Sequence, residues 1–129
     1  MKRRALEVAC GGCHVTRKVL LKYFNQIELM DRASTAVEEA NQLRLQNGNK
    51  IVGVHKESME TFTPDSTFNC IVLRYCIGYL DDEAAVEFLQ KMGQALETEH
   101  RMRARASSSK WFILLQDQTQ VEDSNEGTV

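Results

Sequence analysis

The sequence predicts an α/β protein with a largely parallel, doubly wound sheet and helices on both faces. Three observations predict it. Short apolar segments alternate with segments of helical periodicity, a Gly-Gly pair follows the first apolar segment, and polar or aromatic residues recur where the apolar segments end. Such alternation requires parallel strands joined by helical crossovers, and sheets of this kind bind ligands at the carboxyl ends of their strands.

The first predicted unit is a strand, a glycine turn and a helix. An apolar run from Ala5 to Ala9, interrupted by Glu7, is followed by Gly11-Gly12 and by a helical pattern from Val15 to about Phe24. A glycine turn lets the backbone approach a ligand closely, and the helix N-terminus offers unpaired N–H groups. The turn is therefore a candidate cofactor site, although glycines at this position also occur simply to form the corner.

The second and third strands enclose the second helix. A strand is predicted from Ile27 to Asp31, a helix from Ala33 to about Gln46 that ends at Asn47-Gly48, and a β-branched strand from Ile51 to Val54. The apolar residues at helical spacing in this second helix are Ala36, Val37, Ala40 and Leu43.

The remaining elements repeat the alternation. A long buried strand is predicted from Phe68 to Cys76, a helix from Ala84 to Leu96 capped by Asp81-Asp82-Glu83, a polar loop over 98–109, and a last strand from Trp111 to Leu115. The apolar stripe of the third helix is predicted to consist of Ala85, Val86, Leu89, Met92 and Leu96, facing inward.

Composition limits the classes of function. The chain has 129 residues, 43% of them hydrophobic and 26% charged, which is typical of one globular domain. Its formal net charge of -2 gives no electrostatic basis for a nucleic-acid partner or an anionic membrane. Because no segment resembles a bilayer span or a secretory signal, we expect a cytoplasmic protein, with the nucleus as a second location.

Four features are predicted to lie at strand carboxyl ends: Gly11-Gly12, Asp31, Met59-Glu60 and the segment from Tyr75 to Tyr79. An acid about twenty residues beyond a glycine turn has the spacing that binds the hydroxyls of a nucleoside ribose. The alternative for Asp31 is that it caps the following helix, and the two roles are compatible. Together the four features indicate a nucleoside-containing cofactor across the top of the sheet.

Three blocks carry a resemblance to a known family: Ala5 to Lys18, Ser58 to Pro64, and Ile71 to Asp82. In these blocks the chain resembles the alpha-N-terminal protein methyltransferases. The resemblance implies a Rossmann-like class I methyltransferase fold, S-adenosylmethionine as cofactor, and methyl transfer to the α-amine of protein N-terminal peptides that begin Xaa-Pro-Lys. It runs to about Gln118, which implies a methyltransferase core over 1–118 and a polar tail over 119–129.

The resemblance also assigns roles by position, and it implies no metal. Tyr75 and Tyr79 fall on catalytic positions, and both, with Gln118, fall on positions that bind the substrate peptide. The positions implied to bind the cofactor are Ala9, Gly11, His14, Asp31, Met59, Glu60 and Arg74.

The chain departs from the family pattern within the glycine turn. Ala9 and Cys13 stand where the family has the first and third glycines, and His14 stands where it has an arginine. Cys13 is thereby expected to add a side chain beside the cofactor, and His14, mostly neutral at pH 7, to replace a fixed positive charge. The fold is expected to be incomplete at both ends. A fragment, a paralogue, or a catalytically degenerate binding or scaffold protein remain open alternatives.

The turn also matches patterns of other chemistry. Cys10-Gly-Gly-Cys13-His14 fits the attachment motif of haem c, and the two cysteines alone fit a redox pair or half of a zinc site. Cys70 and Cys76, six apart on one predicted strand, are expected on the same face but too far apart to share a metal. We predict that Cys10 and Cys13 are reduced thiols that carry neither haem nor zinc.

Overall fold

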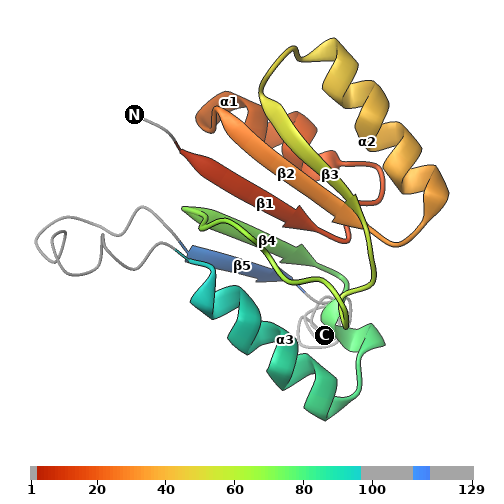
Figure 1. The fold of residues 1–129 in the computed structure, drawn as a ribbon, viewed down its shortest axis with the longest axis vertical. Helices are drawn as coiled ribbons and strands as arrows, with labels where there is room; N and C mark the ends of the chain where they lie inside the picture. Colours follow the sequence, from red (N-terminus) through yellow and green to blue (C-terminus); the bar gives the residue numbers. More distant parts are fainter. Residues whose placement is uncertain (1–2, 97–111, 117–129) are drawn as a thin grey trace, which may run out of the picture.

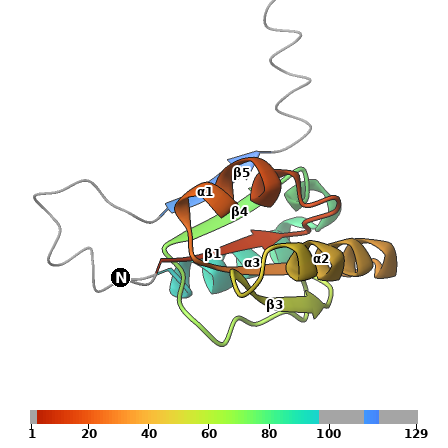
Figure 2. The same ribbon diagram turned by 90° about the horizontal axis from the view of Figure 1, so that it is seen from above.

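The computed structural model describes residues 3–96 and 112–116 and confirms the predicted fold class (Figure 1). Its strands are all parallel, in the order β3-β2-β1-β4-β5, and Figure 2 shows β3 and β5 at opposite edges of the sheet. The elements are β1 (Arg4–Val8), η1 (Thr16–Leu20), α1 (Leu21–Tyr23), β2 (Gln26–Asp31), α2 (Ser34–Gln46), β3 (Ile51–Lys56), β4 (Cys70–Arg74), η2 (Ile77–Tyr79), α3 (Asp82–Gln94) and β5 (Phe112–Gln116).

The helices cover both faces of the sheet because strand side chains alternate in direction. Ala5 of β1 belongs to a core cluster that includes Leu20 from η1 and Leu43 from α2. The next residue, Leu6, belongs to the opposite cluster, which contains Phe88 from α3. The two clusters hold the strands from both sides. Because the strands are parallel, the carboxyl ends of β1 to β4 lie at one edge of the sheet.

The first helix lies where it was predicted but contains a π-helical section, η1, before the short α1. The N–H of Leu21 donates to the carbonyl of Thr16, five residues earlier. Thr16 itself is fully buried. Apolar spacing predicts a helix over this range, but it does not distinguish a π-turn from an α-turn.

Helix α2 follows the predicted pattern closely. It begins at Ser34, one residue later than predicted, and its buried residues are Ala36, Ala40 and Leu43. The chain leaves the helix through Asn47 and Gly48, and Gly48 has a φ of 61°, the left-handed conformation that favours glycine at a helix end.

Strand β4 is shorter than predicted, and the prediction that Cys70 and Cys76 lie on the same face is wrong. The strand ends at Arg74, and Tyr75 has a φ of 58°, so the chain leaves the extended conformation there. Cys70 consequently lies in the cluster under α1 and α2, whereas Cys76 lies in the cluster under α3. The two side chains are on opposite faces because the alternation along a strand does not continue through a left-handed residue.

The predicted stripe of α3 is only partly right. Asp81 accepts a hydrogen bond from the N–H of Ala84 at 2.8 Å, which confirms the predicted cap. Met92 is buried as predicted, but Val86 is 56% exposed, and Phe88, absent from the predicted stripe, is 1% exposed. The buried face runs through 88, 92 and 95, so Val86 lies about half a helical turn away from it.

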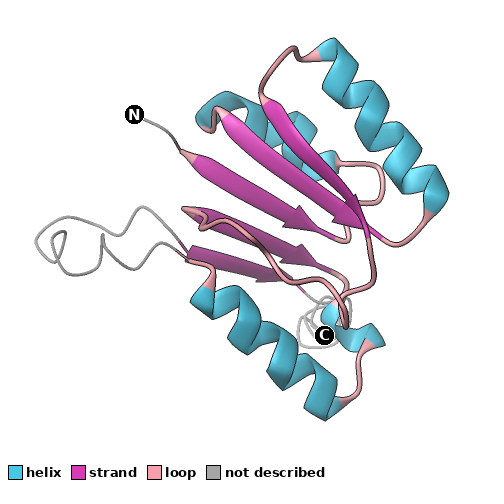
Figure 3. Ribbon diagram, viewed as in Figure 1, coloured by secondary structure: helices cyan, strands magenta, loops and turns pink. Residues whose placement is uncertain are grey.

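The connection from β3 to β4 is a loop rather than a helix in this structure (Figure 3). Its Phe62 is 2% exposed and anchors the loop in the core beneath the sheet. Lys91 of α3 donates to the Phe62 carbonyl at 2.7 Å and to the Glu60 carbonyl at 3.5 Å. Helix α3 therefore holds this loop at the carboxyl edge of the sheet.

Several predictions fall on residues outside the described ranges, namely the loop over 98–109, Gln118 and the tail over 119–129. Within the described residues, no helix combines the length and apolar character that crossing a bilayer requires.

Candidate cofactor and substrate site

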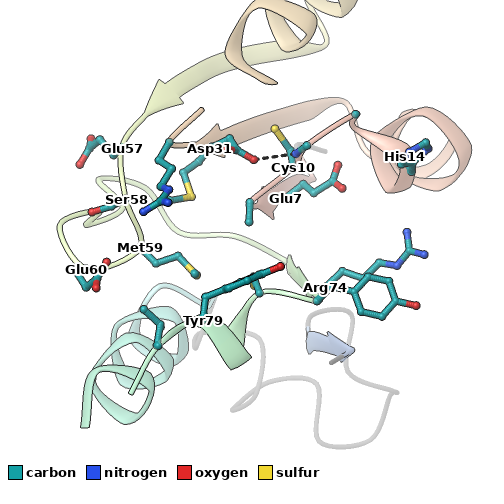
Figure 4. A pocket seen from close by; sticks show the side chains of 18 residues that line it. Glu7, Cys10, His14, Asp31, Glu57, Ser58, Met59, Glu60, Arg74 and Tyr79 are labelled. Carbon is teal, nitrogen blue, oxygen red and sulfur yellow. Dashed lines mark hydrogen bonds between the residues drawn. The ribbon is translucent and has the colours of Figure 1, made fainter. Parts of the chain in front are cut away.

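A cavity of about 690 Å³ opens at the carboxyl ends of β1 to β4 (Figure 4). A volume of this size suits a small-molecule ligand, for which pockets span roughly 300 to 1,000 Å³. The cavity brings together nine residues for which the sequence predicts binding or catalytic roles: Ala9, Gly11, His14, Asp31, Met59, Glu60, Arg74, Tyr75 and Tyr79.

The turn after β1 is tied to the end of β2 by Asp31. One carboxylate oxygen of Asp31 accepts the N–H of Gly11 at 2.9 Å, and the other accepts the N–H of Ala33 at 2.9 Å. The bond to Ala33 lies before helix α2, whose N-cap residue is Ala33 and which has no side-chain cap, so the alternative that Asp31 caps this helix is not supported. Each carboxylate oxygen has a second lone pair, so Asp31 retains capacity to accept from a ligand hydroxyl.

Three residues of the turn have left-handed backbones: Ala9 with a φ of 53°, Gly11 with 51° and Cys13 with 63°. Only Gly11 is a residue that adopts this conformation without steric cost. A Cβ built on Gly11 would meet no atom within 4 Å, so the cavity is open directly above this backbone. The open backbone at Gly11 fits close approach by a ligand.

The Cys13 side chain does not enter the cavity, contrary to the expectation from sequence. Cys13 is 0% exposed and belongs to the core cluster with Ala5 and Leu20. Cys13 does not line the cavity, and its φ of 63° is a conformation that is costly for a non-glycine residue. The substitution of glycine by cysteine therefore strains the backbone instead of filling the cavity.

The two cysteine thiols of the turn interact with each other. Their hydrogen bond raises the pKa of Cys10, which burial raises further, and lowers the pKa of Cys13. Cys10 lines the cavity, whereas Cys13 does not. Among the described residues, no group of three or more His, Cys, Asp or Glu side chains is arranged to hold a metal ion.

Glu7 is a cavity residue to which sequence reasoning assigned no role. It is 4% exposed, and one of its oxygens accepts both the N–H of Thr16 at 3.1 Å and the Thr16 hydroxyl at 2.7 Å. Burial raises the pKa of this carboxyl, an effect that the hydrogen bonds from Thr16 partly oppose. The signal in the sequence was an acid inside an otherwise apolar strand, which indicates a buried charge with a dedicated partner.

The loop after β3 forms one end of the cavity (Figure 4). Ser58 and Thr61 close a turn in which the N–H groups of Thr61 and Phe62 donate to the Ser58 carbonyl at 3.2 and 3.0 Å. Met59 packs against the core cluster under α3, which places an apolar side chain in the cavity wall beside exposed acids at Glu57 and Glu60. This end offers an apolar surface and carboxylates.

The opposite end of the cavity holds His14 and Arg74 (Figure 4). Figure 4 shows His14 and Arg74 at the far side of the cavity from the loop that holds Met59 and Glu60. The Arg74 guanidinium lies 4.9 Å from the centre of the Tyr75 ring, a cation–π arrangement that fixes both groups. Arg74 therefore gives this end of the cavity a fixed positive charge.

The two tyrosines differ in their packing. Tyr75 is half-buried at the end of β4, whereas Tyr79 of η2 is 81% exposed. The exposure of Tyr79 excludes packing beneath helix α3 for this residue. Figure 4 shows Tyr79 across the cavity from Asp31. An exposed aromatic side chain at a cavity mouth is a surface available to a second ligand.

The comparison with known families identifies the chain. The profile of the AdoMet dependent proline di-methyltransferase family matches residues 1–111. The chain belongs to this family. The parallel strand order and the cavity at the strand carboxyl ends agree with that membership.

Curated relatives of this family member have low sequence identity. The human protein named N-terminal Xaa-Pro-Lys N-methyltransferase 1 is 21% identical over 114 residues, covering 88% of this chain and 51% of its own length. The Dictyostelium discoideum protein named alpha N-terminal protein methyltransferase 1 is 25% identical over 93 residues, covering 71% of this chain and 34% of its own. The chain thus spans about half, or less, of these relatives.

Solved structures show the class I methyltransferase fold. A SAM-dependent methyltransferase from Leishmania major has a TM-score of 0.67 and 27% identity, covering 76% of this chain and 39% of that one. The N-methyltransferase NodS from Bradyrhizobium japonicum, in complex with S-adenosyl-L-homocysteine, has a TM-score of 0.65 and 22% identity, covering 74% of this chain and 47% of its own. The second likeness concerns the fold alone.

Proposed function

We propose that this family member binds S-adenosylmethionine and transfers its methyl group to the α-amine of a protein N-terminus, of the Xaa-Pro-Lys type named for its relatives. One observation carries the proposal: a single cavity is lined by all the predicted cofactor residues and by both predicted substrate tyrosines. S-adenosylmethionine would supply a methyl group activated by a positive sulfonium.

The cavity fits such a nucleoside in three parts. Asp31, with an unused lone pair on each oxygen, would accept the two ribose hydroxyls while it holds the Gly11 turn. Met59 and Glu60 would contact the adenine at the loop end. At the opposite end, His14 and Arg74 would face the amino-acid portion, and Arg74 would supply the positive charge that its carboxylate favours.

Tyr75 and Tyr79 would receive the peptide. An aromatic ring gives an apolar surface that suits a proline, and each phenol hydroxyl can hydrogen-bond to the peptide backbone or amine. Alignment of the amine with the methyl group is the main contribution that the site makes, because displacement requires the two to be in line. An α-amine with an ordinary pKa of about 7.7 to 8.0 needs only modest help to lose its proton.

A second candidate function, binding without methyl transfer, is favoured by a separate observation. The two acids nearest the turn, Glu7 and Asp31, are both occupied by hydrogen bonds from the chain itself. Because Glu7 is committed to Thr16 and the remaining lone pairs of Asp31 are assigned to the ribose hydroxyls, neither acid is left to act as a general base for the amine. A degenerate binding protein would keep the cavity and lose the chemistry.

Titration calorimetry tests the binding step. S-adenosylmethionine and S-adenosylhomocysteine are titrated into the protein and into an Asp31→Ala variant. We expect heat with one site per chain for the native protein and weaker binding for the variant. Absence of heat and of any thermal shift at millimolar ligand would overturn the proposed cofactor.

A further inference from the structure

The Cys10 and Cys13 pair forms part of the turn but has no role in the proposed methyl transfer. The two residues are separated by two glycines, and the Cys13 N–H donates to the Cys10 carbonyl at 2.7 Å. Such a turn brings its first and fourth Cα atoms within about 7 Å, and disulfides form at Cα separations of roughly 4.4 to 6.8 Å. The backbone is therefore already folded for a bond between the two sulfurs.

The two side chains belong to the same core cluster, and the Cys13 thiol donates to the Gly11 carbonyl inside the turn at 3.9 Å. Cys10, 5% exposed, lines the cavity, whereas Cys13 is 0% exposed. A small reagent in the cavity would thus reach Cys10 first, and Cys13 would lie behind it.

We propose that Cys10 and Cys13 form a reversible dithiol–disulfide pair in the wall of the cavity, with a low-molecular-weight disulfide as the oxidant. The Cys10 thiolate attacks one sulfur of the reagent and releases the other half as a thiolate. The Cys13 thiolate then attacks the Cys10 sulfur of this mixed disulfide and releases the second half. Overall, one S–S bond forms in the protein and one breaks in the reagent. Two electrons and, through solvent, the two thiol protons pass from the protein to the reagent, which leaves as two thiols.

Access sets this order of events, because Cys10 lines the cavity whereas Cys13 does not. The raised pKa of Cys10 makes its thiolate the minor form at neutral pH, so the first attack is the slow step. Once Cys10 is blocked by the reagent, the remaining thiol is Cys13, next to the bond it must attack. The following residues form a helix whose N-terminus also favours a thiolate.

Two other cysteines must be separated from this pair in any test. Cys70 belongs to the same core cluster as Cys10, and Cys76 lines the same cavity. Digestion with trypsin places the two pairs on different peptides. Cleavage after Arg4 and Arg17 leaves Cys10 and Cys13 together on one peptide. Cleavage after Lys56, Arg74 and Lys91 leaves Cys70 and Cys76 on two separate peptides.

The experiment treats the folded protein with hydroxyethyl disulfide, removes the reagent, alkylates the denatured chain and digests it with trypsin. We expect the peptide from Ala5 to Arg17 to be lighter by two hydrogens and unalkylated, and to regain two alkylation sites after dithiothreitol. A peptide that is alkylated at both cysteines, or one linked to the peptides that hold Cys70 or Cys76, would overturn the proposal.

A pair of variants sharpens the result. Cys70→Ser leaves both members of the turn in place and is expected to close as the native chain does. Cys13→Ser removes the second thiol, so the reagent should remain attached to Cys10 as a stable mixed disulfide. Closure requires no bound nucleoside, so failure to detect methyl transfer would not affect this outcome.

Discussion

The Asp31 carboxylate at the end of β2 accepts the backbone N–H of Gly11, twenty residues earlier in the chain, at 2.9 Å. This bond joins the two features from which the sequence indicated a nucleoside site, and it sets the shape of the turn at the position where the cavity is most open. We therefore expect Asp31 to act on the proposed ligand in two ways, by contact with it and through the turn.

Replacing Asp31 by alanine is expected to weaken nucleoside binding by about 1 to 3 kcal/mol, because the Gly11 N–H and the ribose hydroxyls lose their acceptor. Calorimetry with S-adenosylhomocysteine measures the loss. Asp65→Ala is the matched control, since Asp65 is exposed and does not line this cavity. Equal affinities in the two variants would rule out the role given to Asp31.

The sequence predicted the placement of the site better than the conformation of its turn. Strand ends in a parallel sheet meet at one edge whatever their side chains, so Gly11, Asp31 and Glu60 could be placed together from spacing alone. The direction of Cys13 depends on a single positive φ, for which no local pattern exists in a non-glycine residue. The same limit explains the error at Cys76, which follows the left-handed Tyr75.

Helix α3 shows a different limit of sequence reasoning. Val86 and Phe88 are both apolar, and each fits a helical stripe with some of its neighbours. Only the packing of the loop residues Phe62 and Phe68 into the same cluster decides that Phe88 is the buried one. Contacts between segments that are distant in the sequence decide which residue is buried. The periodicity of apolar residues within one helix gives no information about those contacts.

The left-handed backbone at Ala9 predicts an unusual response to glycine. Ala9→Gly is expected to stabilise the protein by about 0.5 to 1 kcal/mol, because glycine adopts this conformation without steric cost. Ala5→Gly, within β1 and fully buried, is expected to destabilise it by about 1 kcal/mol. Urea unfolding of both variants gives the comparison, and a loss of stability in Ala9→Gly would contradict the strained turn.

Glu7 predicts a pH-dependent stability. Its pKa in the folded protein is raised above the ordinary 4.5, so the folded state binds the proton more tightly than the unfolded state does. The free energy of unfolding should therefore fall as pH rises from that value through the folded pKa, and stay at the lower value above it. The glutamine side chain of Glu7→Gln does not titrate. The free energy of unfolding of this variant, compared with that of the native protein, should therefore increase over that pH range.

Thr16→Val is the companion variant for Glu7. It keeps the buried volume but removes the hydroxyl that donates to the carboxylate at 2.7 Å. The charged form of Glu7 then loses support, which should raise its pKa further and widen the pH range over which stability falls. Urea unfolding across a pH series measures both slopes, and identical slopes in the native and Glu7→Gln proteins would exclude this assignment.

Substitution of Tyr79 is expected to affect peptide binding without affecting the stability of the fold. Because its side chain is 81% exposed, Tyr79→Ala should change stability by less than about 0.5 kcal/mol. We expect the same variant to lower the use of a peptide substrate, and Tyr79→Phe to reveal how much of that loss belongs to the hydroxyl. An unchanged KM and kcat for peptide in Tyr79→Ala would remove Tyr79 from the substrate site.

Methyl transfer to a free peptide amine tests the central claim most directly. The protein is incubated with methyl-labelled S-adenosylmethionine and either a Ser-Pro-Lys peptide or the same peptide acetylated at its N-terminus. We predict label on the free-amine peptide only, and loss of that label in Tyr75→Ala. Cofactor binding by calorimetry with no label on either peptide would contradict the enzymatic account and favour the binding protein.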